Sequence, residues 1–134
     1  MAKIARTPFN AARWLTHETS SSSTITNKLS GYCIFVTVDT DDVTLTVNHL
    51  TKGSYMKIIL TDTSSYQLNV SFPAMEGVAI YDNAGAQVLA LGTNNETTLE
   101  LPANATGGTY IDLICDGEKW YIQAMTEGVA WSQS

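Results

Sequence analysis

The alternation that decides the fold is clearest in the segment DVTLTVN, residues 42–48. Val43, Leu45 and Val47 fall on one side of an extended chain, and the threonines between them fall on the other. Successive side chains of a β-strand point to opposite faces, so this period of two predicts a strand with one buried face. The same pattern returns over residues 66–72.

Outward from these two segments, short runs rich in Val, Ile, Thr, Tyr and Phe fill the chain from Gly31 onward. No run in this part has the spacing of a long amphipathic helix. We therefore expect about nine strands, at residues 31–38, 42–48, 54–61, 66–72, 77–82, 86–91, 96–101, 108–115 and 118–125.

Turn-forming residues separate the expected strands. Asp82-Asn83-Ala84-Gly85 and Asp116-Gly117 tolerate positive φ angles, and Asp116-Gly117 is a hairpin signal between two strong strands. Strands spaced by roughly 8–12 residues without intervening helices predict antiparallel pairing in a sandwich or barrel. We expect an all-β chain of 134 residues, with an antiparallel β-sandwich of jelly-roll type over residues 30–134.

The first 29 residues differ from the rest, because their apolar groups are scattered and residues 16–24 are polar and of low complexity. Such a segment buries too little apolar area to order itself, so residues 1–29 are predicted to be an extended N-terminal arm and linker. One interpretation is a disordered tail. The other is an attachment arm that orders on a partner, with partner-binding residues Arg6, Phe9, Arg13, Trp14 and Leu15.

Charge is divided unevenly along the chain, whose net charge is −6. The arm carries four basic residues against one acidic residue, whereas residues 30–134 carry three lysines against twelve acids. Such an acidic body is expected to repel nucleic acid and anionic lipid, so we expect neither nucleic acid nor membrane as a partner. The first residues lead into no apolar signal-peptide region, which predicts synthesis in a cytosol.

Catalytic motifs are not recognisable in the sequence. His17 and His49 form no zinc-binding helix motif, and no nucleophile elbow or phosphate-binding glycine loop accompanies them. Cys33 and Cys115 lie inside apolar strand patterns, where a buried inert thiol is the usual state, and the sequence leaves their pairing open. We expect a protein that is not an enzyme, with no catalytic residue, cofactor or metal site.

Two weaker patterns have a functional and a structural interpretation. Asp39, Asp41 and Asp42 supply the oxygen ligands that calcium prefers but lack the spacing of an EF-hand, which favours a solvated hairpin tip. Trp120 and Tyr121, together with Tyr110, could form a stacking platform for carbohydrate. Alternation places Trp120 and Tyr121 on opposite faces of one strand, so Trp120 is predicted to be a core residue.

The expected strand YMKIIL (residues 55–60) follows Lys52-Gly53, and LNVSFP (68–73) comes after it. The segment YIDLICDGEKWYI (110–122) contains the motif Asp-Gly-x-x-Trp-Tyr-Ile, which predicts a hairpin turn followed by a strand. Through these stretches, about half of the chain resembles the small β-modules of tailed-phage virion proteins. Such modules occur in capsid decoration (cement) proteins and in head or tail fibres.

The resemblance implies a non-enzymatic virion structural protein, commonly a homotrimer, that an N-terminal segment attaches to the particle. A short chain without a repetitive shaft favours a capsid decoration protein on the capsid surface, with the major capsid protein or another virion protein as its partner. Strand faces rich in threonine also favour self-association. The alternative is a tail or head fibre module that binds a host receptor or carbohydrate, and an enzyme accessory module is a weaker third interpretation.

Overall fold

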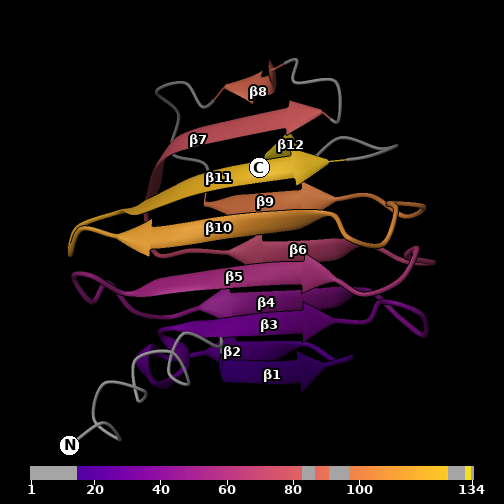
Figure 1. Ribbon diagram of the computed structural model, residues 1–134, viewed down its shortest axis with the longest axis horizontal. Helices are drawn as coiled ribbons and strands as arrows, with labels where there is room; N and C mark the ends of the chain where they lie inside the picture. The colour runs from indigo at the N-terminus through magenta and orange to yellow at the C-terminus, as the bar shows by residue number, and fades with distance from the viewer. Residues whose placement is uncertain (1–14, 83–86, 91–96, 127–131, 134) are drawn as a thin grey trace, which may run out of the picture.

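The computed structural model describes residues 15–82, 87–90, 97–126 and 132–133, and nearly all regular structure in these ranges is β. The strands form two layers (Figure 1). In spatial order, the larger sheet contains β1 (Leu15–Thr19), β3 (Tyr32–Val36), β5 (Tyr55–Leu60), β10 (Tyr110–Cys115), β11 (Trp120–Thr126), β7 (Met75–Asp82) and β8 (Gln87–Ala90). The smaller sheet contains β12 (Ser132–Gln133), β9 (Thr98–Leu101), β6 (Leu68–Ser71), β4 (Val43–Val47) and β2 (Ser23–Ile25).

Both sheets are mixed, so the prediction of antiparallel pairing throughout is corrected. The first six strands alternate between the sheets, which makes β1, β3 and β5 parallel in one sheet and β2, β4 and β6 parallel in the other. Later strands add antiparallel pairs, including β10 with both β5 and β11. Parallel neighbours require a crossover connection. Here a strand of the opposite sheet provides it, which the spacing of strands along the sequence does not distinguish from a hairpin.

The positions of the nine expected strands are confirmed, each by one of the strands β3 to β11. In β4, Val43, Leu45 and Val47 are buried, while Thr44 and Thr46 lie on the outer side. This is the arrangement that the alternation predicted. The first 29 residues and the last few were not expected to contain strands, yet β1, β2 and β12 form there.

Two strands, β1 and β2, lie within the residues expected to form the arm, and each belongs to one of the two sheets. β1 pairs with β3 and β2 pairs with β4, and a short 3-10 helix, η1 (Asn27–Leu29), joins β2 to β3. Ile25 of β2 is 1% exposed and is part of the core. Residues 1–14 of the expected arm lie outside the described residues.

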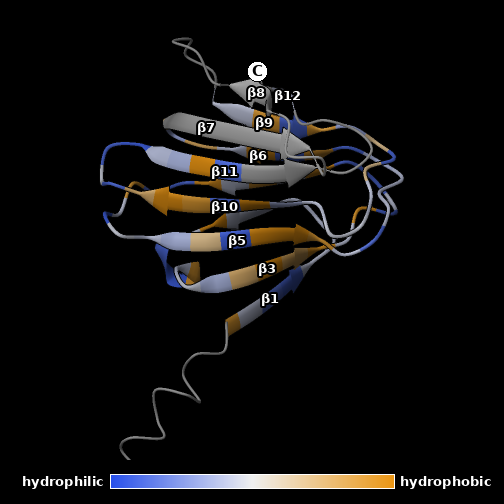
Figure 2. Cartoon of the chain, turned by 45° about the horizontal axis from the view of Figure 1, so that its top comes forward, coloured by the Kyte–Doolittle hydropathy of each residue, from blue (hydrophilic) through white to orange (hydrophobic). Residues whose placement is uncertain are grey.

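One hydrophobic core fills the space between the sheets, and both sheets contribute to it. Trp120 is the largest side chain in it and has no exposed surface. Most residues of β5 and β10, near the centre of the larger sheet, are hydrophobic (Figure 2), and one charged residue interrupts each strand, Lys57 in β5 and Asp112 in β10. Among the residues that the structure describes, no helix has the length and hydrophobicity of a membrane span.

Candidate functional site

Three apolar side chains form a row on the outer surface of the larger sheet. Ile114 of β10 is the register partner of Tyr55 on β5 and of Tyr121 on β11. Their exposed fractions are 52% for Ile114, 41% for Tyr55 and 38% for Tyr121. Strand alternation explains the row, because the residues next to each of the three point into the core.

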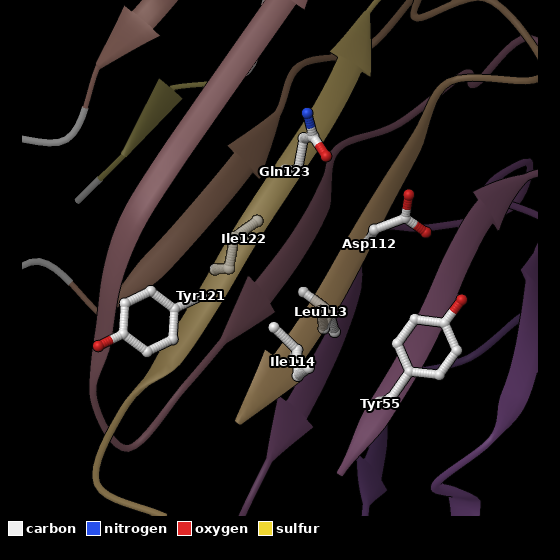
Figure 3. Close-up of a pocket in the computed structure, with 7 residues that line it drawn as sticks. All are labelled: Tyr55, Asp112, Leu113, Ile114, Tyr121, Ile122 and Gln123. Atoms are coloured by element: carbon white, nitrogen blue, oxygen red, sulfur yellow. The ribbon is translucent and has the colours of Figure 1, made fainter. Parts of the chain in front are cut away.

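The row borders a hollow of about 380 Å³ on the sheet surface. Figure 3 shows Tyr55 and Tyr121 on either side of Ile114, with Asp112 and Gln123 next to it along the strands. We call these five side chains the tyrosine face. Adjacent strands lie about 4.8 Å apart, so the two tyrosines stand on strands separated by about 10 Å.

A hydrogen bond fixes the ring of Tyr121. Its hydroxyl donates to Oδ2 of Asp116 at 3.0 Å, while Oδ1 of Asp116 accepts the backbone N–H groups of Glu118 and Lys119, each at 2.8 Å. These backbone hydrogen bonds, from Glu118 first and then Lys119, lower the pKa of the Asp116 carboxyl below its ordinary value. Asp116 therefore closes the hairpin turn expected at Asp116-Gly117 and positions an aromatic ring of the tyrosine face.

A charge pair lies beside the apolar row. Nζ of Lys57 is 3.6 Å from Oδ1 of Asp112, its register partner, and 4.2 Å from the centre of the Tyr110 ring. Gln123 continues the same row as the register partner of Asp112. The tyrosine face thus combines apolar surface with a few polar groups, which is the composition of many ligand-binding surfaces.

The two cysteines are free thiols on opposite sides of the larger sheet. Cys115 belongs to the core, whereas Cys33 is the register partner of Lys57 on the outer side. Burial raises the pKa of the Cys33 thiol, although the charge of Lys57 acts in the opposite direction. A raised pKa keeps this thiol protonated and weakly nucleophilic near neutral pH.

Other residues singled out in the sequence do not gather into a site in the described ranges. The carboxylates of Asp39 and Asp41 each accept a hydrogen bond from the next residue in the chain. Oδ1 of Asp42 accepts the N–H of Gln67, 25 residues away, at 2.9 Å. No group of three or more His, Cys, Asp or Glu side chains there is placed to hold a metal ion. The three aspartates lie in the connection from β3 to β4, which belong to different sheets, so the prediction of a hairpin tip there is wrong.

The predicted partner-binding residues fall mostly outside the described ranges, as Arg6, Phe9, Arg13 and Trp14 precede them. Leu15 opens β1 and is 58% exposed, so it is accessible to a partner. The arrangement of the five residues relative to one another therefore lies outside the described part of the chain.

The sequence suggested a carbohydrate-stacking platform of Trp120, Tyr121 and Tyr110, but these three side chains do not lie together on one exposed surface in the structure. Trp120 is a core residue, as predicted, and Tyr121 lies on the outer side. Tyr110 lies under the ammonium group of Lys57. Tyr55 was missed, although alternation within YMKIIL places it on the outer side. Its position beside Ile114 depends on the pairing of β5 with β10, which the sequence does not specify.

His49 packs against Trp120 at the edge of the core. The two ring centres are 5.3 Å apart in an edge-to-face arrangement, and Nε1–H of Trp120 donates to the His49 carbonyl at 2.9 Å. Nδ1 of His49 lies 3.2 Å from Oγ1 of Thr51 and 3.4 Å from the backbone nitrogen of the same residue. Nε2 is buried and has no hydrogen-bond partner within the described part of the chain. Burial lowers the pKa of this imidazole below its ordinary value of 6.5.

We expect acidification to destabilise the fold through His49. The unfolded chain binds the imidazole proton more readily than the folded chain, so the free energy of unfolding should decrease as the pH falls through 6.5. This decrease should end below the pKa of the folded state. Thermal unfolding followed by circular dichroism from about pH 8 to pH 5 measures the effect. His49→Gln removes the titrating group, and an unchanged pH dependence in that variant would contradict the assignment.

The chain matches no protein-family model, and no curated protein or solved structure is significantly similar to it.

Proposed function

We propose that this protein is a non-enzymatic structural protein of a phage virion, a capsid decoration (cement) protein that binds and stabilises the head shell as a homotrimer. The resemblance of residues 53–122 to tailed-phage β-modules supports this proposal. The two-sheet body supports it as well, because a β-sandwich with one core is a stable unit for display on a particle. We propose a β-sandwich that departs from a jelly roll in its first six strands.

The outer surface of the smaller sheet is the proposed contact between subunits. Register partners on four adjacent strands form a row of hydroxyl side chains, Thr24, Thr46, Ser71 and Thr98. We call these residues the hydroxyl row; it is the observation on which the trimer proposal rests. They are small and uncharged, so burying them costs little side-chain entropy and requires no desolvation of a charge.

Attachment to the particle is assigned to the N-terminal end. Residues 1–14 lead into β1, the edge strand of the larger sheet, and carry the two arginines and two aromatic residues of the predicted arm. An edge strand presents unpaired backbone N–H and C=O groups to which another chain can add. The major capsid protein or another virion protein is the proposed partner, on the capsid surface of a particle assembled in the host cytoplasm.

We expect Thr46→Arg to convert the trimer to monomers. The substitution places three like charges, one from each subunit, in the proposed contact, where desolvation is expensive. Sedimentation velocity at micromolar concentration and physiological salt measures the change. Because each subunit carries a net charge of −6, assembly of the unmodified protein should also weaken at low ionic strength.

The matched control is Gln123→Arg, which adds the same charge to the exposed surface of the other sheet and should leave the trimer intact. An unmodified protein that sediments as a monomer would contradict the trimer. For the virion role, capsids that carry the protein should survive heating better than bare capsids, because a ligand of the intact shell stabilises it. Equal survival would favour the second candidate function.

The second candidate is a tail or head fibre module that binds a host receptor or carbohydrate. The tyrosine face favours it, because exposed aromatic rings beside a hollow are an unusual use of surface for a purely structural protein. The two candidates use different sheets, so the experiments on the hydroxyl row do not affect the tyrosine face.

A further inference from the structure

We infer that the tyrosine face binds a neutral, extended oligosaccharide that lies across strands β5, β10 and β11. The inference deepens the second candidate function by assigning its ligand class and its residues, and it rests on that function rather than on the trimer. Its starting point is the hollow of about 380 Å³ that Tyr55, Ile114 and Tyr121 help to line. Ile114 lies between the two tyrosine rings (Figure 3).

The chemistry of a sugar ring matches this surface. A pyranose presents C–H groups on its flat faces and hydroxyls around its rim. Aromatic rings provide large, rigid, apolar contact surfaces for the faces. The carboxylate of Asp112 accepts hydrogen bonds from hydroxyls, and the amide of Gln123 both donates and accepts them. Both side chains line the hollow between the tyrosines.

The spacing of the tyrosines selects an extended chain rather than a single sugar. The rings stand on strands about 10 Å apart, which is more than one pyranose spans. A chain of linked sugars that crosses the strands can contact both rings and rest on Ile114 between them. The hydrogen bond from Tyr121 to Asp116 holds one ring in place before binding, which reduces the entropy lost on association.

Charge selects a neutral glycan. Asp112 contributes a carboxylate to the hollow, and the ammonium group of Lys57 is already paired with it at 3.6 Å. The remainder of the chain has a net charge of −6, which repels sulfated or sialylated chains at a distance. Nucleic acid is disfavoured for the same reason, although its bases could stack on tyrosine.

The test is a titration of the full-length protein with neutral hexasaccharides of glucose, N-acetylglucosamine, galactose and mannose, and with an anionic hexasaccharide of hyaluronan. Isothermal calorimetry and amide chemical shifts measure binding. We expect at least one neutral chain to bind and to shift the resonances of β5, β10 and β11. Tyr55→Ala and Tyr121→Ala should each weaken binding at least tenfold. A disaccharide of the same sugar should bind more weakly than the hexasaccharide.

The matched control is Tyr66→Ala. Tyr66 is 40% exposed, similar to Tyr55, but does not line the hollow, so this variant should bind like the unmodified protein. Tyr121→Phe keeps the ring, loses the hydrogen bond to Asp116 and should weaken binding less than Tyr121→Ala. Circular dichroism verifies that each variant is folded.

Failure of all neutral chains to bind, or binding that survives both alanine substitutions, would overturn the inference. Preference for the anionic chain would overturn the ligand class. Thr46→Arg should bind the glycan like the unmodified protein, so loss of the trimer and loss of glycan binding are separate results.

Discussion

Replacing Trp120 with alanine is expected to lower the free energy of unfolding by about 3–5 kcal/mol. The indole has no exposed surface, and its ring centre lies 5.3 Å from that of His49 and 6.3 Å from that of Phe72. Alanine would leave a cavity that these neighbours fill only in part, and it would remove the donor to the His49 carbonyl. Urea unfolding measures the decrease in the free energy of unfolding. It should be followed by far-ultraviolet circular dichroism rather than by tryptophan fluorescence, because the variant lacks Trp120.

Trp120→Phe separates the packing of the ring from its hydrogen bond. It retains an aromatic ring and should cost less than alanine, about 1–3 kcal/mol, because the partly buried His49 carbonyl loses its donor. A loss of less than about 1 kcal/mol in the alanine variant would show that the indole is not a core residue.

Truncation at the N-terminus is expected to have two different effects, depending on where it ends. A variant lacking residues 1–14 should retain its β-structure and unfolding temperature but lose attachment to capsids. A variant lacking residues 1–25 should in addition lose at least about 3 kcal/mol, because it removes β1, β2 and the buried side chain of Ile25. Far-ultraviolet circular dichroism and cosedimentation with capsids measure the two effects.

The shorter truncation is the control for the longer one, since both remove the same basic and aromatic residues. Full occupancy of capsids by the variant lacking residues 1–14 would place attachment in the two-sheet body. An unchanged unfolding temperature in the variant lacking residues 1–25 would show that β1 and β2 add nothing to the stability of the sheets.

The strands that the sequence predicts are those whose alternation is imposed by burial on one face. DVTLTVN is recognisable because Val43, Leu45 and Val47 all pack into the core. The sequence does not predict β1, because the side chains of Leu15–Glu18 are exposed and LTHET therefore has no alternation of apolar and polar residues. Its position is determined instead by backbone hydrogen bonding to β3, which a side-chain pattern does not record.

The direction of pairing and the candidate site depend on contacts between distant segments. Side chains alternate with a period of two in both parallel and antiparallel strands. The sequence therefore does not indicate that β1 to β6 alternate between the two sheets and pair in parallel. Tyr55 and Tyr121 each occupy a predictable outer position, but their common neighbour Ile114 is set by the register of β10. Sequence alternation therefore predicts the sides of strands and leaves their neighbours undetermined.

The position of β10 has a consequence for how the chain folds. It is the middle strand of the larger sheet, yet it is made after β1 to β9. During synthesis the six alternating strands can wind onto one another as they emerge, since each adds beside a strand made shortly before. The pairing of β10 with β5 closes a much longer loop, which is slower. Until it forms, the nascent chain exposes the edge of β5, and this is the interval in which aggregation competes with folding.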